Sequence, residues 1–388
     1  MGINNAETAA DICMFVHNDV SSDGRVLKEA GSLAAQGWKV VVVGVALGQK
    51  DLPEVETIAN FTVIRITPRF LRQTLPGTVG KLLRLMLAVP AAARAMRQTR
   101  AHVYHGNDFI GLLMVALAGI WRRPVVYDSH ELFFDRYPKG IFNYPLKYVI
   151  WTLRPLEKIL ARRAAAVMTV SDSLAKLLST TLGVPMPVVV RNVVDLRELT
   201  DAVPINRPEG MRLVAHTGTL LGGRHLAELV ESLKYLPSDV SLVLIGDGKL
   251  RAQLIEQAQN LGVADRLLTI YPVTPFNIPT TLAQADAAVV LTSPDYQIAL
   301  PNKFFEAVAA GVPIIGTSLQ EVKALIERYD LGVICDPKDP ASIAEQINHV
   351  LQPDNLARYK ANALHARAEL TWEAEERKLV ALYKRILG

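Results

Sequence analysis

Residues 300–317 of this chain read Leu-Pro-Asn-Lys-Phe-Phe-Glu-Ala-Val-Ala-Ala-Gly-Val-Pro-Ile-Ile-Gly-Thr. The pattern predicts a loop, a helix, a tight turn and a buried strand. Pro301 suits the first helical position, where its missing N–H costs nothing. Gly311 stands where a left-handed C-terminal cap is favoured. The helix cannot continue through Pro313, and the apolar run after it is typical of a strand covered on both faces.

The polar side chains of this stretch stand at the front of its helix. A helix start presents unpaired N–H groups and a partial positive charge, which attract phosphate. Asn302 lies at that start, and Lys303 adds a full cation. Glu306, one turn further on, can accept hydrogen bonds from two vicinal hydroxyls, as an acidic residue does for ribose in dinucleotide folds. Phosphate beside ribose describes a nucleotide diphosphate. The alternative is an ordinary helix whose first turn carries Lys and Glu.

A second loop with phosphate-binding chemistry runs from Gly218 to Arg224 and reads Gly-Thr-Leu-Leu-Gly-Gly-Arg. It follows an expected strand and precedes an expected helix. The glycines let the backbone approach a ligand closely, and Arg224 supplies a bidentate cation. The loop nearly matches a P-loop, but Arg224 replaces the lysine and His225 removes the hydroxyl that would hold Mg²⁺. The sequence therefore disfavours a P-loop NTPase.

Length and composition indicate a large globular protein. The 388 residues, 50% of them hydrophobic, suffice for two large cores. Cys13 and Cys335 lie in apolar, strand-like runs, so we expect them buried and reduced, with no metal cluster built on them. Residues 1–11 lack the basic and apolar regions of a signal peptide. The apolar run 109–121 is too short to span a bilayer. We expect a cytoplasmic protein.

The net charge is only +4, but it is unevenly distributed. Residues 57–107 contain no Asp or Glu, which suggests an anionic partner. The cations of this span are Arg65, Arg69, Arg72, Lys81, Arg84, Arg94, Arg97 and Arg100. The leucines and the methionine interleaved with them are Leu71, Leu75, Leu82, Leu83, Leu85, Met86 and Leu87. This mixture suits a helix on an anionic membrane surface. The alternative is that the leucines face the core and leave a solvated basic face.

Both halves alternate strands with helices, which predicts an α/β fold with parallel sheets. In the first half the expected strands are 11–16, 38–44, 63–66, 101–104, 124–127, 166–170 and 188–190. The expected helices there are 25–36, 82–97 (interrupted or bent at Pro90), 144–163 and 173–182. In the second half the expected strands are 213–217, 241–245, 267–271, 287–291, 313–316 and 332–334. The expected helices there are 225–235, 250–261, 279–284, 301–310, 321–328 and 341–351, with two closing helices over 355–370 and 372–387.

Two groups of polar residues follow strands of the first half. His105 and Asp108 come after one strand, and Asp128, His130 and Glu131 come after the next. In open α/β sheets the carboxyl ends of the strands form the ligand-binding edge. We therefore expect His105 and His130 to face a ligand. The alternative is that each histidine is a local hydrogen-bonding group.

Taken together, these stretches resemble the retaining glycosyltransferases of family 4, most densely over 300–316. The resemblance covers nearly the whole chain. It implies the GT-B fold, in which two Rossmann-like, doubly wound domains face a central cleft and the last helix crosses back to the first domain. The composition places the linker at 204–210. We expect an acceptor domain over 1–203, a nucleotide-sugar donor domain over 204–370, and a returning helix over 371–388.

The resemblance also assigns roles to individual residues. It implies that Glu306 binds the ribose, Arg224 binds the donor diphosphate and His130 contacts the donor sugar. The nucleobase lies beside Val273, and the loop that holds Asp23 faces the cleft. The expected catalytic residues are His130, Arg224 and Lys303, and the expected substrate-binding residues are Gly218, Asn302, Glu306, Val273, Asp23 and His105.

The chain departs from the family pattern at three positions. Ile298 stands where many members carry a second glutamate, although a subgroup shows the Leu-Pro-Asn-Lys run found here. Thr219 stands where many carry an arginine. In the junction Asn-Val-Val-Asp, which begins at Asn192, Val193 replaces the usual glycine.

These observations predict a retaining glycosyltransferase that moves a sugar from a nucleotide-diphosphate sugar to a glycan or lipid-linked acceptor, in cell-surface glycan or glycolipid synthesis. The chain has no Asp-x-Asp pair, so we expect no metal and no cofactor besides the co-substrate. We expect no nucleic-acid partner, and a peripheral contact with the inner face of the cell membrane. The alternatives are a nucleotide-sugar epimerase of the same fold and a non-enzymatic two-domain binding protein.

Overall fold

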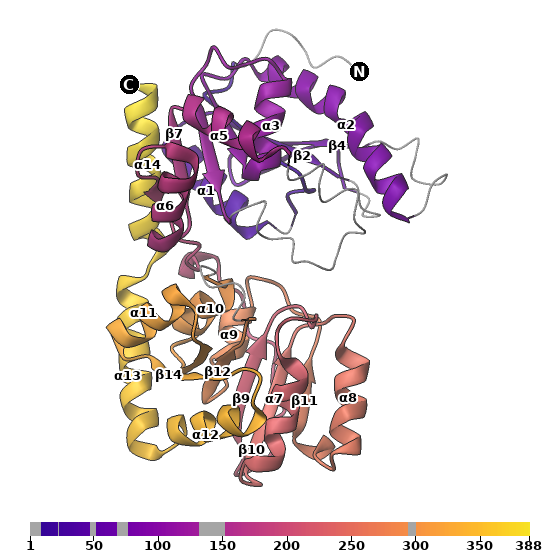
Figure 1. Ribbon diagram of the computed structural model, residues 1–388, viewed down its shortest axis with the longest axis vertical. Helices are drawn as coiled ribbons and strands as arrows, with labels where there is room; N and C mark the ends of the chain where they lie inside the picture. The colour runs from indigo at the N-terminus through magenta and orange to yellow at the C-terminus, as the bar shows by residue number, and fades with distance from the viewer. Residues whose placement is uncertain (1–8, 22, 47–51, 68–76, 132–151, 294–299) are drawn as a thin grey trace. The chain divides into compact units, whose positions relative to one another are not determined.

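The computed structural model describes residues 9–21, 23–46, 52–67, 77–131, 152–293 and 300–388, without the side chains of 77–85. The chain forms two compact units (Figure 1). The first unit comprises Met1–Arg191 and Glu375–Gly388, and the second comprises Asn192–Ala374. Each unit is built on a sheet with helices around it, so the expected α/β class is confirmed.

The boundary between the units falls at Arg191, earlier than the linker expected from composition. After that residue the chain already bonds to the second unit. The N–H of Thr200 donates to the carbonyl of Phe276 at 3.0 Å, and the N–H of Val203 donates to Oγ1 of Thr281 at 3.0 Å. The polar segment 204–210 is therefore a surface stretch within the second unit. The return to the first unit falls at Glu375, not at residue 371.

The first unit has an eight-stranded sheet with the order β3-β4-β2-β1-β5-β6-β7-β8. All neighbours pair in parallel except β3, which is antiparallel to β4. The strands are β1 (Ile12–Val16), β2 (Val40–Val45), β3 (Val55–Ile58), β4 (Phe61–Ile66), β5 (Val103–Asn107), β6 (Val125–Ser129), β7 (Ala166–Thr169) and β8 (Val188–Val189). In the central strand β1 every residue is apolar and buried, as a strand covered on both faces requires.

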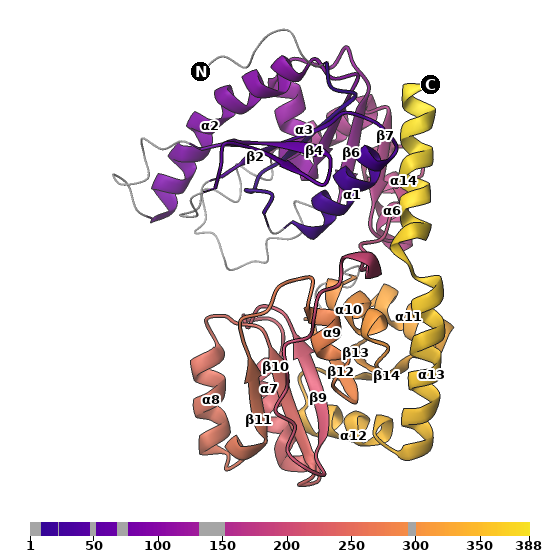
Figure 2. The ribbon, with the colours of Figure 1, turned by 180° about the vertical axis from the view of Figure 1, so that it is seen from behind.

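Helices connect these strands. They are α1 (Gly24–Ala35), α2 (Gly77–Thr99), α3 (Asp108–Leu117), α5 (Arg154–Arg163) and α6 (Asp172–Leu178), and a π-helical turn η2 follows (Ser179–Gly183). The last helix, α14 (Trp372–Leu387), lies beside α6 (Figures 1 and 2). From Glu375 onwards it belongs to the first unit, and Tyr383 on it is fully buried. The expected return of the C-terminal helix is confirmed.

The second unit has six parallel strands in the order β11-β10-β9-β12-β13-β14. They are β9 (Arg212–Thr217), β10 (Val240–Ile245), β11 (Leu267–Ile270), β12 (Ala287–Val290), β13 (Ile314–Thr317) and β14 (Gly332–Cys335). Successive residues of β9 and β10 point into two different hydrophobic clusters, so the sheet has a core on each face.

The helices of the second unit are α7 (Leu226–Ser232), α8 (Arg251–Asn260), α9 (Ile278–Leu282), α10 (Asn302–Ala310), α11 (Gln320–Tyr329), α12 (Pro340–Val350) and α13 (Pro353–Glu369). Short 3₁₀ turns are η3 (Leu196–Glu198), η4 (Leu233–Tyr235) and η5 (Ala264–Arg266). Clusters on one face pack under α7, α8 and α12, and those on the other face pack under α9, α10, α11 and α13.

Several sequence predictions need correction or completion. Pro301 is the N-cap of α10 and not its first helical residue, because its ψ of 142° is extended. Helix α2 runs through Pro90, and α3 and β3 were not predicted. The expected helix start at 144 lies outside the described residues. Within the described part, this helix runs from Arg154 to Arg163.

Helix α3 follows β5 without a loop, and this junction depends on two glycines. A Cβ atom on Gly106 would lie 2.6 Å from the backbone nitrogen of Leu112 and 2.7 Å from the carbonyl carbon of Gly111. Backbone atoms cannot yield as a flexible side chain does. The strand end that carries His105 is therefore held against α3 by close backbone contact.

We expect Gly106→Ala to lower the free energy of unfolding of the first unit by about 1–3 kcal/mol, since the added methyl group overpacks this junction. Gly31→Ala is the matched control in the interior of α1, where a Cβ meets no atom within 4 Å. That change should be stabilising by up to about 1 kcal/mol through helix propensity. Denaturant unfolding followed by circular dichroism measures both. Equal midpoints for Gly106→Ala and the wild type would contradict the close contact.

Candidate functional site

The second unit brings together Gly218, Arg224, Lys303 and Glu306, which we call the cation cluster. Lys303 and Glu306 stand on the first turns of α10, Gly218 follows β9 directly, and Arg224 closes the loop after it. Of the residues expected from the sequence, these four are close in space. They come together because the carboxyl ends of parallel strands, and the helix starts that follow them, lie at the same edge of the sheet.

Lys303 is held by a neutral histidine. Its Nζ lies 2.7 Å from Nε2 of His216, and both side chains are buried. Nδ1 of His216 lies 3.1 Å from the carbonyl oxygen of Val289, which can only accept a hydrogen bond. Nδ1 therefore carries the hydrogen, and Nε2 accepts from the ammonium group. Burial, together with the charge of Lys303, holds the pKa of His216 well below its usual value.

The charge of Lys303 is costly in this position. Burial and the nearby Arg224 guanidinium lower the pKa of Lys303 to about 7, although Glu306 opposes the shift. Lys303 is only 8% exposed, so water does little to stabilise the ammonium group. An anion at this point would supply the missing negative charge. The cation cluster therefore favours binding of an anion, which would stabilise the charged form of Lys303.

Gly218 leaves the space in front of both cations open. A Cβ atom on it would lie 3.2 Å from Cε of Lys303 and 3.6 Å from Nη1 of Arg224. The φ angle of Gly218 is +96°, which side-chain-bearing residues rarely adopt. Nη1 of Arg224 also donates to the carbonyl of Thr219 at 2.5 Å, which fixes the guanidinium. Two cations beside bare backbone form a suitable cradle for phosphate.

Glu306 is positioned by Thr217, the last residue of β9. Oγ1 of Thr217 donates to Oε2 of Glu306 at 2.6 Å. Burial raises the pKa of Glu306, while the Thr217 hydroxyl and Lys303 lower it. The carboxylate is thus fixed one turn behind the cations. This position suits a pair of hydroxyls attached close to a phosphate.

Asn302 and Val273 lie at the margins of this cluster. Asn302 is exposed at the start of α10, and its Oδ1 accepts from Nδ2 of Asn192 at 3.0 Å. Val273 is half-buried in the loop after β11 and packs on the core that lies beneath α10. Ile298, where the family pattern departs, lies outside the described residues.

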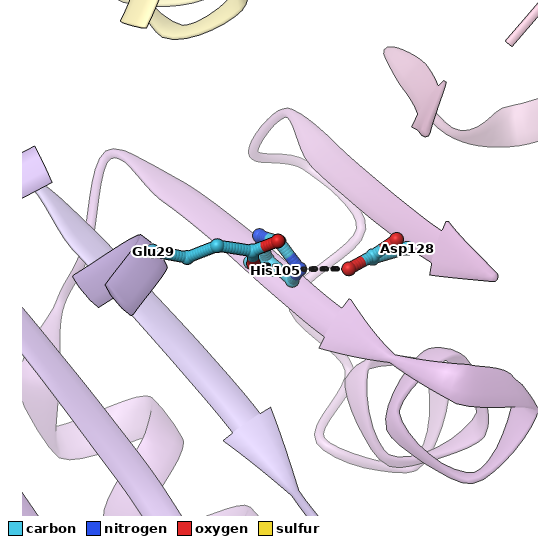
Figure 3. Close-up of side chains that lie close together, drawn as sticks. All are labelled: Glu29, His105 and Asp128. Atoms are coloured by element: carbon cyan, nitrogen blue, oxygen red, sulfur yellow. Dashed lines mark ion pairs between the residues drawn. The ribbon is translucent and has the colours of Figure 1, made fainter. Parts of the chain in front are cut away.

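The first unit contains a second group of charged residues, the carboxylate cluster, which consists of Glu29, His105 and Asp128 with Arg25 and His130 around them. Figure 3 shows the first three side chains converging from α1, β5 and β6. Glu29, His105 and Asp128 have no exposed surface, and Arg25 is 4% exposed. Such complete burial of charge requires close pairing.

Arg25 supplies that pairing. Its Nε and Nη2 donate to the two oxygens of Asp128 at 2.9 and 3.1 Å, and its Nη2 lies 3.0 Å from Oε1 of Glu29. Burial raises the pKa of Glu29 to about 7, although Arg25 opposes the shift. Burial also opposes ionisation of Asp128, but Arg25 and His130 outweigh it and hold that pKa well below the usual range.

His130 is bound at both ring nitrogens by carboxylates. Nε2 lies 2.8 Å from Oδ2 of Asp128, and Nδ1 lies 3.5 Å from Oδ1 of Asp108. Burial disfavours the imidazolium, but the two carboxylates outweigh burial and raise the pKa of His130 to about 9. Nε of Arg25 also lies 3.1 Å from Nε2 of His130. When His130 is charged, both of its ring nitrogens carry hydrogens, so Nε2 cannot accept from Arg25. Nε2 then donates to Asp128. His130 is a cation at neutral pH.

Glu29, His105 and Asp128 have the residue types and spacing of a metal site, with ligand atoms within 4.8 Å of one another. The donor set does not fit one. Oδ2 of Asp128 already accepts from Arg25 and His130, and Arg25 balances the charge of Glu29. A divalent ion would have to displace the buried guanidinium, whose charge it would otherwise repel.

Two expected substrate-binding residues have other partners in this structure. Asp23 is the N-cap of α1, where its Oδ1 accepts from the N–H of Val26 and its Oδ2 from Nδ2 of Asn18. His105 is buried, and its Nδ1 lies 2.6 Å from the hydroxyl of Tyr383. Asp23 thus caps the start of α1 and His105 lies beneath the surface, so both support neighbouring groups.

Sequence reasoning missed several residues of these clusters. His216 and Thr217 end the expected strand 213–217, so the strand-edge rule applied to His105 could have found them. Arg25 and Glu29 are one turn apart on an expected helix, a spacing that indicates a pair but does not indicate burial. Nothing in the sequence connects Tyr383 with His105.

Each half of the chain matches a glycosyltransferase family. Residues 25–198 match the family described as Glycosyltransferase Family 4, and residues 200–366 match Glycosyl transferases group 1. The chain is 25% identical to the 2-deoxystreptamine glucosyltransferase of Streptomyces kanamyceticus, over 94% of this chain and 98% of that protein. It is also 25% identical to the N-acetyl-alpha-D-glucosaminyl L-malate synthase of Bacillus anthracis, but that match spans only 50% of this chain and 49% of the other.

Solved structures share the fold. Sucrose-phosphate synthase from Thermosynechococcus elongatus superposes with a TM-score of 0.76 at 17% identity, over 97% of this chain and 98% of that chain. HepE of Anabaena, in complex with UDP and glucose, superposes with a TM-score of 0.70 at 18% identity, over 97% and 100% of the two chains. At these identities the likeness concerns the fold, and it confirms the expected GT-B class.

The lowered pKa of Lys303 predicts that anion binding depends on pH. An anion favours the charged amine, so binding above about pH 7 must take up a proton, and affinity should fall by up to tenfold per pH unit. Below about pH 7 the amine is already charged and affinity should be flat. Sulfate is a suitable probe because its own charge is constant here. Thermal-shift titrations from about pH 6 to about pH 9 would measure the dissociation constant.

Lys303→Met should abolish this pH dependence, and Lys323→Met, an exposed lysine of α11 in the same unit, should preserve it. Parallel pH curves for the wild type and Lys303→Met would contradict the assignment.

Proposed function

Since this chain belongs to glycosyltransferase family 4, we propose that it moves a sugar from a nucleotide-diphosphate sugar to an acceptor hydroxyl with retention of configuration at the anomeric carbon. The observation that carries the proposal is the cation cluster, in which Arg224 and Lys303 converge on bare backbone at Gly218, one turn of helix from Glu306. HepE of Anabaena, which shares the fold, binds UDP and glucose, and this supports the same class of donor.

In this proposal the second unit binds the donor. The diphosphate lies between Arg224 and Lys303, and the ribose hydroxyls donate to Glu306. The negative charge on the diphosphate grows as the bond between the anomeric carbon and the leaving oxygen breaks. Two fixed cations in a water-poor site stabilise that charge, and they need no reorganisation to do so. This arrangement supports departure of the leaving group without a metal ion.

The first unit is proposed to bind the acceptor and to present His130. Asp128 holds Nε2 of its imidazolium, so the hydrogen on Nδ1 is the one proposed to donate to an oxygen of the donor sugar, in place of the 3.5 Å ion pair with Asp108. The acceptor oxygen then bonds to the anomeric carbon on the face that the diphosphate leaves, and the acceptor proton passes to the departing phosphate oxygen. The reaction therefore balances without a general base from the protein.

Incubation with radiolabelled nucleotide sugars tests the function against its alternatives. A donor is first chosen by thermal shift and then incubated with a lipid and glycan extract. Label in an acceptor supports the transferase. Label in an isomeric nucleotide sugar would indicate an epimerase. Donor binding without turnover on any extract would favour a binding protein.

Glu306→Ala should weaken binding of the selected donor by about 30-fold. It removes two ribose hydrogen bonds, each contributing about 1 kcal/mol. Glu345→Ala is the control, because Glu345 is an exposed glutamate on α12 of the same unit. Titration calorimetry measures both affinities. If Glu306→Ala binds the donor as tightly as Glu345→Ala does, the ribose is bound elsewhere.

We also propose that the first unit docks on an anionic membrane and takes a lipid-linked acceptor there, as expected for an enzyme of cell-surface glycan or glycolipid synthesis. Helix α2 supports this. Met86 and Leu87 on it are 62% and 54% exposed, and Arg94 and Arg97 are exposed two turns later. Among the described residues, the helices include none with the length and apolarity needed to cross a bilayer. A peripheral contact is therefore the form proposed.

The structure corrects one part of the basic span. Arg65 is buried, donating to the carbonyls of Asp19 and Pro53 and pairing with Glu56, so it cannot face a membrane. Arg69, Arg72, Leu71 and Leu75 lie outside the described residues, and the side chains of Lys81, Leu82, Leu83, Arg84 and Leu85 are not described.

Flotation with liposomes tests the membrane contact. The protein should float with anionic vesicles at low salt and not with neutral ones, since each cation near the surface contributes about 1 kcal/mol. Replacing Met86 and Leu87 together by Ser should reduce recovery. Leu364→Ser, an exposed leucine of α13 in the second unit, should not. Equal recovery with neutral and anionic vesicles, or none with either, would rule out this surface.

A further inference from the structure

The carboxylate cluster is joined to the C-terminal helix by one hydrogen bond. Tyr383 on α14 is fully buried, and its hydroxyl lies 2.6 Å from Nδ1 of His105 on β5. The two rings are nearly parallel, with an angle of 10° between them. The bond therefore connects residues 278 positions apart in the chain.

The groups around this bond favour one direction for it. Burial raises the pKa of Tyr383 well above its usual value, and the charges of Glu29 and Asp128 raise it further, so the hydroxyl keeps its hydrogen. Burial lowers the pKa of His105 to about 4, so its ring is neutral. A neutral pair can bond in two ways, because a phenol oxygen can also accept from Nδ1–H. The carboxylates of Glu29 and Asp128 beside Nε2 favour the arrangement in which the hydrogen is on Nε2, the tyrosine donates and Nδ1 accepts. The hydrogen of the His105 ring is consequently on Nε2.

Nε2 of His105 faces the two carboxylates that surround it. It lies 3.9 Å from Oε2 of Glu29 and 3.9 Å from Oδ2 of Asp128 (Figure 3). These distances are too long for hydrogen bonds, and Nε2 has no hydrogen-bond partner within the described part of the chain. In a buried site the N–H dipole still stabilises two nearby negative charges. The other tautomer would aim a lone pair at them.

We propose that Tyr383 is a positioning residue for His130: by donating to Nδ1 of His105 it fixes the tautomer that keeps Asp128 in place, and Asp128 in turn holds His130. The role of His130 in transfer rests on the function proposed above. The tautomer does not, because it follows from contacts within the first unit alone.

The electrostatic surroundings of His130 set the sign of the effect. The titratable groups around it are Arg25 and Glu29 from α1, His105 from β5, Asp108 from α3 and Asp128 from β6, with Tyr383 behind His105. If the His105 N–H turns away from Asp128, that carboxylate is less stabilised and attracts the proton of His130 more strongly. The pKa of His130 should then rise above about 9.

Nitrogen-15 NMR of histidine-labelled protein tests the tautomer directly and needs no substrate. The wild type should show His105 with the hydrogen on Nε2. Tyr383→Phe should shift His105 towards the other tautomer and raise the pKa of His130. Tyr104→Phe is the matched control, because Tyr104 is a buried tyrosine of the same unit whose hydroxyl bonds to backbone at Ala101 and Met96. It should leave both signals unchanged.

Two NMR results would overturn the proposal. One is a wild-type spectrum with the hydrogen on Nδ1 of His105, which is decisive even if Tyr383→Phe does not fold. The other is an unchanged tautomer in Tyr383→Phe.

Kinetics test whether the tautomer matters for transfer. Tyr383→Phe should lower kcat by about tenfold, as the loss of one buried hydrogen bond allows, and leave the KM for the donor unchanged. In a His105→Gln background the amide N–H can take the place of Nε2–H without help from Tyr383. There the second change should have little further effect. Two outcomes would show that Tyr383 has a structural role only. One is an equal loss of kcat in Tyr383→Phe and Tyr104→Phe. The other is that Tyr383→Phe lowers kcat as much in the His105→Gln background as in the wild type.

Discussion

The constraint on which both units depend is that a parallel sheet gathers the carboxyl ends of its strands at one edge. Parallel neighbours are mostly joined through a helix, so most strand ends are followed by a helix start that carries unpaired N–H groups. In the second unit this brings Gly218, at the end of β9, to Lys303, at the start of α10. In the first unit it brings Asp128 and His130 together with Arg25 and Glu29 of α1. The polar chemistry of both units arises from this geometry.

The two units balance their buried charges in opposite ways. In the first unit a guanidinium and an imidazolium are paired with carboxylates, so His130 keeps its proton to about pH 9. In the second unit Lys303 donates a hydrogen bond to the neutral His216, which supplies no negative charge. The charge of Lys303 is therefore incompletely balanced until an anion binds. His130 thus keeps its charge through carboxylates that are already present, whereas Lys303 gains a full counter-charge only when an anion binds. This contrast supports donor binding by the second unit and a positioning role for the inner residues of the first.

Much of the fold could be predicted, because β9 to β14 are short, mostly apolar runs that alternate with helices. Helix α3 could not, since it begins at Asp108 directly after a strand, in a backbone conformation with φ of +56°, and leaves no loop signal. The position of residues at strand ends was predictable, but their burial was not. His105 and His130 have the same context in the sequence, yet one is buried and the other 24% exposed. His216 acts through Lys303, 87 residues away, and such a partner cannot be found from local sequence.

The central claim is that the cation cluster binds the diphosphate of the donor. A crystal structure of the chain with a nucleotide-diphosphate sugar tests it most directly. We expect the diphosphate oxygens to lie against the backbone of Gly218, within hydrogen-bond distance of Nζ of Lys303 and the guanidinium of Arg224, with the ribose hydroxyls on Glu306. A nucleotide bound in the first unit, or one bound in the second unit with Lys303 still resting on His216 and no phosphate beside it, would contradict this account.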